Sequence, residues 1–277
     1  MSRVYHYTTP AGLEGIMRST SVWASDYRFL NDPTEFRYGV EVFKRHFESY
    51  RQSKNALHSK TLMEMLSQRL EGLLREHTAG IATPCVFVAS FSLEPDLLSQ
   101  WRGYNGGRGF SLGLNTQWVD ENARTQGFEF TPMAYDKTQQ AQAVFDRLKV
   151  LSAKHLEDNE DHDSLDGLWE NALRVILALK HPAYSEEREY RAVKVMHTWS
   201  SKVKTRATGA GLVPYLPLSL SEKPAIASMN HPQNKGFEHI IVGPALHARQ
   251  RAAVDALQAS LHMRFDVTLS DIPYVAD

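Results

Sequence analysis

Residues 84–92, PCVFVASFS, decide the fold, because they are the clearest strand signal in the chain. The run from Cys85 to Ala89 is apolar on both sides of an extended chain, as expected of a strand in the middle of a sheet. Ser90 and Ser92 follow where the apolar run stops. The stretch therefore predicts a central strand with two hydroxyl side chains at its C-terminal end.

The sequence before this strand predicts helices. Asp32-Pro33-Thr34-Glu35 has the spacing of a capping box, in which Asp32 accepts a first-turn N–H and Glu35 reaches back to the cap. Apolar residues then recur at helical spacing, and a second amphipathic pattern runs from about 56 to 77. We expect a helical insertion at about 33–78, with Asp32 in a structural role.

The N-terminal stretch VYHYTTPAGLEGIM, residues 4–17, predicts a strand that ends directly before a helix. Thr9 followed by Pro10 has the pattern of an N-cap with proline in the first turn. His6 and Tyr7 then lie where a strand gives way to a turn, a place that often presents groups to a ligand. The alternative interpretation is that His6 is a hydrogen-bonded structural residue.

A late stretch, YSEEREYRAVKV at residues 184–195, predicts a strand with two neighbouring carboxylates. Alternation of side chains places Glu187, Glu189 and Arg191 on one face of that strand. Two interpretations remain open. The carboxylates form ion pairs on a solvent-facing edge, or they lie at the rim of a cleft and divide acid, base and charge-stabilising roles between them.

The rest of the chain alternates strands and helices without an internal repeat or a clear domain boundary. The acidic stretch at about 157–166 is expected to be a solvated loop and not a metal site. A strand, a Gly-Pro turn, a helix and a further strand follow at the C-terminal end. We therefore predict a single α+β domain over residues 1–277, with a mixed or antiparallel central sheet split around a cleft and helices packed outside.

Composition excludes several classes of protein. The 277 residues are 42% hydrophobic and 23% charged, which is enough for a sizeable core. A net charge of -1 excludes a global basic field but leaves local patches open. Cys85 is the single cysteine, and no apolar run reaches the roughly 18 residues that a membrane span needs. Because the first residues lack a secretory leader, we expect a cytoplasmic protein that does not enter a membrane.

Two common catalytic patterns receive no support from the sequence. It has no His-Glu-x-x-His or paired cysteines for zinc, so we assign no metal ligands. Its Gly-x-Ser-x-Gly at residues 109–113 lies inside a predicted strand and not at the strand-to-helix turn of a nucleophile elbow, so we assign no serine nucleophile. A metal-dependent nuclease stays open, because carboxylates that converge on Mg²⁺ need not be close in sequence; its residues would be Asp32, Asp96, Glu187 and Glu189. A non-catalytic sensor module that binds a nucleotide or a partner also stays open.

Six motifs resemble, in order and spacing, those of a bacterial family known as domain of unknown function 2971. They are YHYTTPAGLEGIM, FLNDPTEF, ASFSLEPDLLSQWRGY, KHPAYSEEREYR, HIIVGP and SDIPY. The resemblance covers nearly the entire chain, but it implies no activity.

Tyr5-His6-Tyr7-Thr8 before a helix is also similar to the Tyr-His-Gly-Thr start of diphtheria-toxin-like and poly-ADP-ribosylating enzymes, although Tyr7 replaces their frequent glycine. This resemblance implies an ADP-ribosyltransferase-like fold, NAD as the substrate and Glu189 as the catalytic carboxylate. Glu187 would orient the acceptor or act as its base. The matching NAD-binding positions are His6, Tyr7, Thr8, Ser90 and Ser92, with Arg102 or Arg28 at the pyrophosphate and Tyr104, Tyr27 or Tyr38 as the stacking ring.

The function expected from this resemblance is transfer of ADP-ribose from NAD to an acceptor. By extension, the same resemblance implies a role in bacterial defence or as a toxin. The acceptor is a protein, a nucleic acid or a small molecule, and the sequence predicts neither which of these it is nor the oligomeric state.

Overall fold

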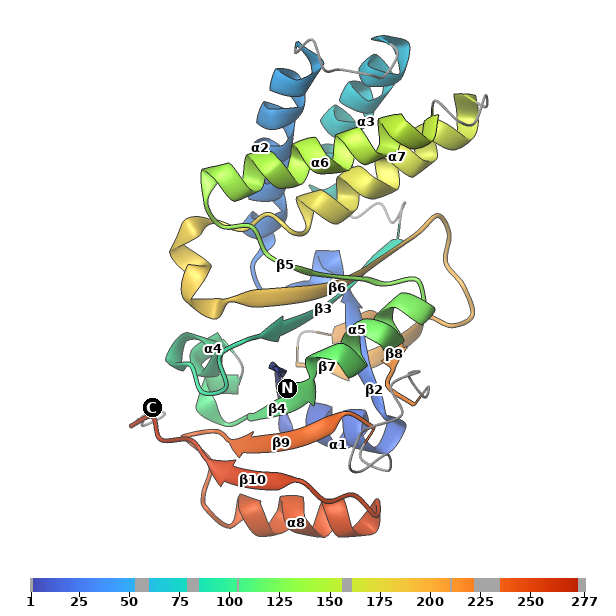
Figure 1. The fold of residues 1–277 in the computed structure, drawn as a ribbon. Coiled ribbons are helices and arrows are strands. Elements are labelled where there is room, and N and C mark those ends of the chain that lie inside the picture. Colours follow the sequence, from blue (N-terminus) through green and yellow to red (C-terminus); the bar gives the residue numbers. More distant parts are fainter. Residues whose placement is uncertain are drawn as a thin grey trace.

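The computed structural model describes residues 2–52, 60–78, 85–103, 105–155, 161–209, 211–221 and 235–273. Within these ranges ten strands form one mixed sheet with helices on both of its faces (Figure 1). The strands are β1 (Arg3–Thr8), β2 (Ser21–Asp26), β3 (Cys85–Ser92), β4 (Phe110–Asn115), β5 (Glu129–Pro132), β6 (Glu189–Met196), β7 (Lys204–Thr208), β8 (Gly211–Ser219), β9 (Phe237–Val242) and β10 (Asp266–Leu269).

The helices form two layers, one on each face of the sheet. They are α1 (Pro10–Ser19), α2 (Pro33–Arg51), α3 (Lys60–Thr78), α4 (Leu98–Gly103), α5 (Thr116–Thr125), α6 (Lys137–His155), α7 (Asp161–Ile176) and α8 (Gln250–Ser260), with 3-10 turns η1 (Tyr27–Phe29), η2 (Asn105–Gly107) and η3 (Pro182–Glu187). The layer of α2, α3, α6 and α7 lies above the sheet in Figure 1. None of the described helices is both long and apolar enough to cross a membrane.

Strand β3 is central, as the sequence predicts, and its two faces belong to different cores. Val86 and Val88 pack under the layer of α2, α3, α6 and α7, while Phe87, Ala89 and Phe91 pack in the core shared with α1, α5 and α8. Alternation along an extended chain produces this division. Burial on both faces explains why the strand is apolar throughout.

The sheet divides along one edge of β3. The other edge of β3 pairs with β6 along its whole length, from Cys85 opposite Met196 to Ser92 opposite Glu189. On the dividing edge, β2 pairs at Phe87 and Val88, and β1 pairs only at Ser92. The mixed sheet of the α+β prediction is therefore present, with β9 and β10 as its parallel pair. The cleft and the ADP-ribosyltransferase-like form of the fold stay predictions.

The start of α2 confirms one half of the predicted capping box and corrects the other. The Thr34 N–H donates to Asp32 Oδ1 at 2.8 Å, so Asp32 is the N-cap. Glu35 does not reach back to the cap. Its carboxylate forms ion pairs with Lys180 and Arg191, because a buried pair of cations lies on the other side of the helix terminus.

The acidic stretch predicted as a loop is partly helical. Residues from Asp161 onward belong to α7, whose buried face begins at Leu165. Residues 156–160 lie outside the described residues.

Candidate functional site

The two predicted catalytic carboxylates lie where η3 gives way to β6. The strand begins at Glu189, so the prediction that Glu187 lies on it is wrong: Glu187 ends η3. Arg188 between them has a left-handed backbone with φ of 43°. That turn breaks the strand alternation. The two carboxylates nevertheless meet, because both bind the same ammonium group.

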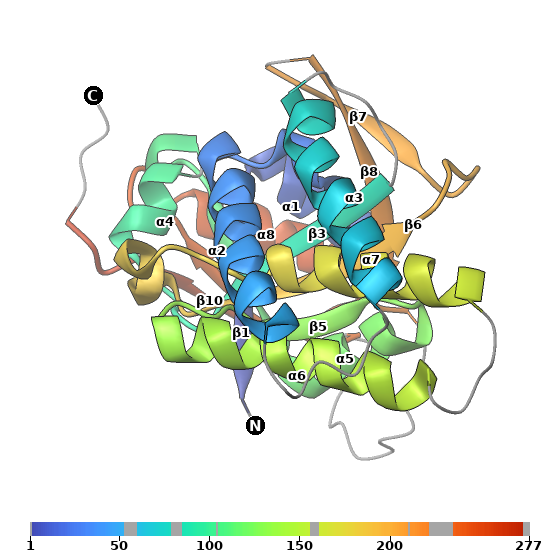
Figure 2. The ribbon, with the colours of Figure 1, turned by 90° about the horizontal axis from the view of Figure 1, so that it is seen from above.

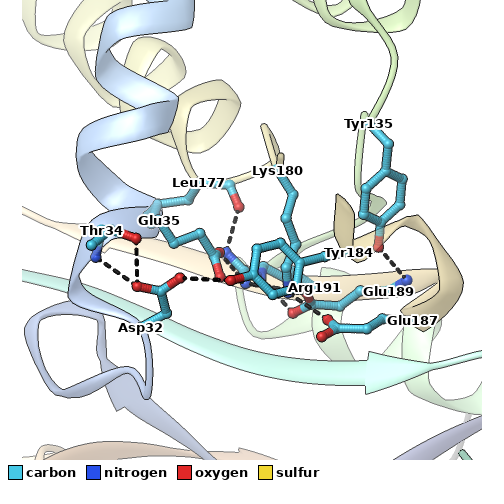
Figure 3. Close-up of polar contacts among 10 residues, drawn as sticks. All are labelled: Asp32, Thr34, Glu35, Tyr135, Leu177, Lys180, Tyr184, Glu187, Glu189 and Arg191. Carbon is cyan, nitrogen blue, oxygen red and sulfur yellow. Dashed lines mark hydrogen bonds and ion pairs between the residues drawn. The ribbon is translucent and has the colours of Figure 1, made fainter. Parts of the chain in front are cut away.

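Lys180 is the centre of the site (Figure 3). Its Nζ lies 2.6 Å from Oε2 of Glu187 and 2.6 Å from Oε2 of Glu189. Oε2 of Glu35, from the first turn of α2, lies 3.5 Å from the same Nζ. One ammonium group thus faces three carboxylates that come from α2, η3 and β6.

Arg191 neutralises the opposite side of Glu189. Its Nε donates to Oε1 of Glu189 at 2.6 Å and its Nη2 to Oε2 at 3.2 Å, while Nη1 donates to the Leu177 carbonyl at 3.0 Å. Nη2 also forms the ion pair with Glu35. Glu189 therefore has both oxygens occupied, in a side chain that is 6% exposed.

The backbone around the site is fixed from the neighbouring elements. The Glu189 N–H donates to the Tyr135 hydroxyl at 2.9 Å, and the Met133 N–H donates to the Glu189 carbonyl at 2.9 Å. The side-chain amide of Gln140, on α6, donates to the Lys180 carbonyl at 3.0 Å. These contacts hold the backbone on either side of the ion pairs, so the geometry of the ion pairs is preorganised.

Burial and charge shift the pKa values of the two carboxylates in opposite directions. Burial raises the pKa of Glu187, and attraction to Lys180 offsets this only in part. Burial acts on Glu189 in the same sense, but Arg191 and Lys180 outweigh it and lower its pKa to about 2. The pKa of Lys180 is raised, since its carboxylate neighbours outweigh its burial. Such a divided pair has one carboxylate suited to proton transfer and one that stays ionised.

Glu187 is the carboxylate through which the site reaches solvent. Its side chain is 13% exposed, and among the described residues no hydrogen bond or ion pair engages its Oε1. Tyr184 lies beside it on η3 and is 41% exposed, with the Lys180 ammonium 5.3 Å from its ring centre. Acid–base chemistry on a bound molecule is thus available at Glu187, whereas Glu189 is sealed behind Arg191 and Lys180.

Two N-terminal residues of the predicted site, His6 and Thr8, lie on the other face of the sheet from Glu189. Tyr5 of β1 lies opposite Ser92, and Ser92 lies opposite Glu189, so these three side chains share one face of the sheet. His6 lies on the other face, where its ring contacts Phe91 at 5.6 Å. His6 and Glu189 therefore do not project from the same face of the sheet.

His6, Thr8 and Tyr7 each have a structural partner. Nδ1 of His6 lies 2.9 Å from the Ser90 carbonyl, which can only accept, so Nδ1 carries the hydrogen; burial lowers the pKa of the ring to about 4. Thr8 is buried against Gly12 of α1. The Tyr7 hydroxyl donates to the Glu94 carbonyl at 2.9 Å and accepts from the Leu97 N–H at 3.0 Å.

The remaining predicted site residues lie in different parts of the structure. Ser92 joins the cluster, since its hydroxyl donates to the Glu187 carbonyl at 2.6 Å and holds the end of η3. Ser90 is half-buried in β3, where it lies opposite Arg191 of β6, and Arg102 is exposed on α4. Arg28 is paired with the buried Asp26 at 2.6 Å. Tyr104 lies outside the described residues.

The four carboxylates of the nuclease alternative do not assemble. Asp96 accepts from the Trp101 indole at 2.5 Å and from the Ser270 hydroxyl at 2.6 Å, at the C-terminal end of the described chain. Asp32 is the cap of α2. In the part of the chain that the structure describes, no group of three or more His, Cys, Asp or Glu side chains could hold a metal ion.

Sequence reasoning missed Lys180, Glu35 and Tyr135. Lys180 stands in a Lys-His-Pro stretch that matches no catalytic pattern, and Glu35 was predicted only as part of a cap. The signal available in the sequence was the density of charge: the short segment from Lys180 to Arg191 contains three glutamates and three lysine or arginine residues.

Comparison with known proteins finds a family match that includes this segment. Residues 100–192 match the model of a family described as "Protein of unknown function (DUF2971)". The match supports the predicted resemblance over about a third of the chain, not over nearly all of it. It includes Lys180, Glu187, Glu189 and Arg191 and does not reach His6 or Glu35. No curated protein and no solved structure matches the chain.

Proposed function

We propose that the protein cleaves the nicotinamide glycosidic bond of NAD and transfers ADP-ribose, with Glu187 as its acid–base group. One observation carries the proposal: Glu187 and Glu189 bind a single Lys180 ammonium and have pKa values shifted in opposite directions. A base that is stronger than an ordinary carboxylate and open to solvent is what activation of an acceptor requires.

In the proposed reaction one bond forms at C1′ of the nicotinamide ribose and one bond at the same carbon breaks. An acceptor O–H or N–H attacks C1′ of the nicotinamide ribose, the C1′–N1 bond breaks, and its electron pair leaves with neutral nicotinamide. Glu187 takes the proton of the acceptor. Positive charge that develops on the ribose is stabilised by the cluster, whose three carboxylates exceed its two cations.

Glu189 has a different role from the one that the resemblance implies. Because both of its oxygens are bound to Arg191 and Lys180, it is proposed as a positioning residue that fixes Lys180 beneath Glu187. His6 is not proposed as a ribose ligand, since its ring lies on the opposite face of the sheet.

NAD as the substrate rests on the resemblance and on strand order. The three strands that the resemblance names, β1, β3 and β6, are direct neighbours at Ser92, where Tyr5 pairs on one side and Glu189 on the other. Tyr184 supplies an exposed ring beside the cluster on which nicotinamide or adenine can stack.

The test combines NAD calorimetry with chromatography of released nicotinamide for the wild type, Glu187→Gln and Glu186→Gln. Glu186 is the matched control, because it is exposed and precedes Glu187 on η3. We expect Glu187→Gln to lower nicotinamide release by about 10²- to 10⁴-fold with little change in NAD affinity, and Glu186→Gln to behave as the wild type.

Three outcomes contradict parts of this proposal. Absence of saturable NAD binding in the wild type removes NAD as the substrate. Binding without release makes the protein a non-catalytic nucleotide-binding module. Equal losses in the two glutamine variants remove the acid–base role of Glu187.

A further inference from the structure

A basic and aromatic surface covers the end of the sheet formed by β2, β7 and β8. Strand β7 is the last in the sheet order, and all of its residues except Arg206 are exposed. Figure 2 shows the hairpin of β7 and β8 at the periphery of the molecule, beyond the helices that cover the centre of the sheet. This surface is separate from the Lys180 cluster and is not used by the proposed reaction.

Strand register brings the aromatic and basic side chains to one face. Ser25 and Lys204 both lie opposite Tyr215, on either side of β8. Directly opposed residues share a face, as do residues two apart along one strand. The side chains on this face therefore include those of Trp23, Ser25, Lys204, Arg206 and Tyr215.

The side chains on this face contact one another. The rings of Trp23 and Tyr215 lie 5.1 Å apart, and the guanidinium carbon of Arg206 lies 5.6 Å and 5.8 Å from their respective centres. Nη2 of Arg206 donates to the Ser25 hydroxyl at 2.8 Å, which fixes the guanidinium against the rings. Both rings are partly exposed. Aromatic and guanidinium planes of this kind are surfaces on which unpaired bases stack.

Positive charge is concentrated around these rings. The sequence has no acidic residue between Glu189 and Glu222. Lys204 and Arg206 of β7 lie on the face of the rings, and Lys202 lies in the turn before β7. Lys202 and Lys204 are exposed. In a chain whose net charge is -1, this is a local patch that attracts phosphates.

We propose that the face of β2, β7 and β8 binds single-stranded nucleic acid, with Lys202 and Lys204 on its phosphates and with Trp23, Tyr215 and Arg206 stacked on its bases. Phosphates account for the charge, and unpaired bases account for the exposed rings. The phosphates of a duplex can also contact the lysines, but its bases stay stacked on one another and cannot stack on the exposed rings.

The test measures fluorescence anisotropy of fluorescein-labelled oligo(dT) and oligo(U), each of about 12 nucleotides, at several salt concentrations. Lys202→Glu with Lys204→Glu is compared with Arg249→Glu with Arg251→Glu, which changes the same charge at the same spacing at the α8 end of the molecule, where both arginines are exposed. We expect Lys202→Glu with Lys204→Glu to make the plot of log affinity against log salt less steep, by about 1.4 or more in the magnitude of its slope. The α8 variant should leave the slope unchanged.

A stacking variant tests the rings separately. Tyr215→Ala is expected to weaken binding about tenfold at every salt concentration without changing the slope. Trp23 is left intact, because its ring packs against Gly15 of α1. Circular dichroism of each variant checks the fold. No saturable binding by the wild type, equal losses in the hairpin and α8 variants, or equal affinity for a duplex of the same length would each overturn the proposal.

Discussion

Glu189→Gln removes the buried carboxylate that holds two cations, and its cost follows from the pKa of that carboxylate. Burial alone would raise the pKa of Glu189, but attraction to Arg191 and Lys180 lowers it from 4.5 to about 2. Since one pKa unit corresponds to about 1.4 kcal/mol, the ionised group stabilises the fold by about 3 kcal/mol at pH 7. We expect the variant to lose about that much free energy of unfolding.

The sign of the pH dependence is fixed by the direction of the shift. A carboxylate with a lowered pKa in the folded state binds fewer protons there than in the unfolded state, so its contribution is complete above about pH 4.5 and is lost as the pH falls towards 2. At pH 3 about half of it remains. The wild type and the variant should therefore converge in stability as the pH falls.

Urea denaturation followed by tryptophan fluorescence measures both quantities, with Glu186→Gln as the control on an exposed neighbour of the cluster. The expected difference between the wild type and Glu189→Gln is about 3 kcal/mol at pH 7 and about half of that at pH 3, and the control should stay within about 0.5 kcal/mol of the wild type. A difference below about 1 kcal/mol at pH 7, or one that does not narrow at pH 3, would refute the inferred electrostatics.

Three further outcomes are expected. His6 should titrate near pH 4 and not near 6.5 in an NMR titration, so the fold loses stability as the pH falls from about 6.5 towards 4; titration at the ordinary value contradicts its burial. Gly236→Ala should cost about 2 kcal/mol or more in urea denaturation, because Gly236 has φ of 79° and a Cβ there would lie 2.6 Å from the Trp118 ring, whereas Gly167→Ala in α7 meets no atom within 4 Å and should cost nothing. Glu187→Gln should keep or raise the stability at pH 7, since the raised pKa of Glu187 means that its ionisation opposes folding, and a loss comparable to that of Glu189→Gln contradicts this.

Local patterns predicted the elements better than they predicted the site. The central strand β3, the cap of α2 at Asp32 and the N-terminal strand and helix depend on residues that are neighbours in sequence, and all three are present. The break before β6 was missed because alternation assumes an extended backbone, and Arg188 adopts a left-handed one. A single such residue moves Glu187 off the strand.

The site itself depends on contacts that no local pattern contains. Glu35 and Arg191 come from α2 and β6, so their ion pair follows from how the helical layer docks on the sheet. The side of the sheet on which His6 lies likewise depends on its register with Ser92, which the sequence of β1 does not specify. No local sequence pattern around Lys180 predicts a partner for it.

Stability and chemistry separate at the two carboxylates that share Lys180. Ionisation of Glu189 favours folding, so a purely structural network explains Glu189 completely. Ionisation of Glu187 opposes folding, and a structural role does not explain why a half-buried carboxylate with a raised pKa is placed beside an exposed tyrosine. Residues that act at the expense of stability are typical of functional sites. A Glu187→Gln variant that is as stable as the wild type but inactive on NAD would therefore assign the chemistry to Glu187 and the support to Glu189.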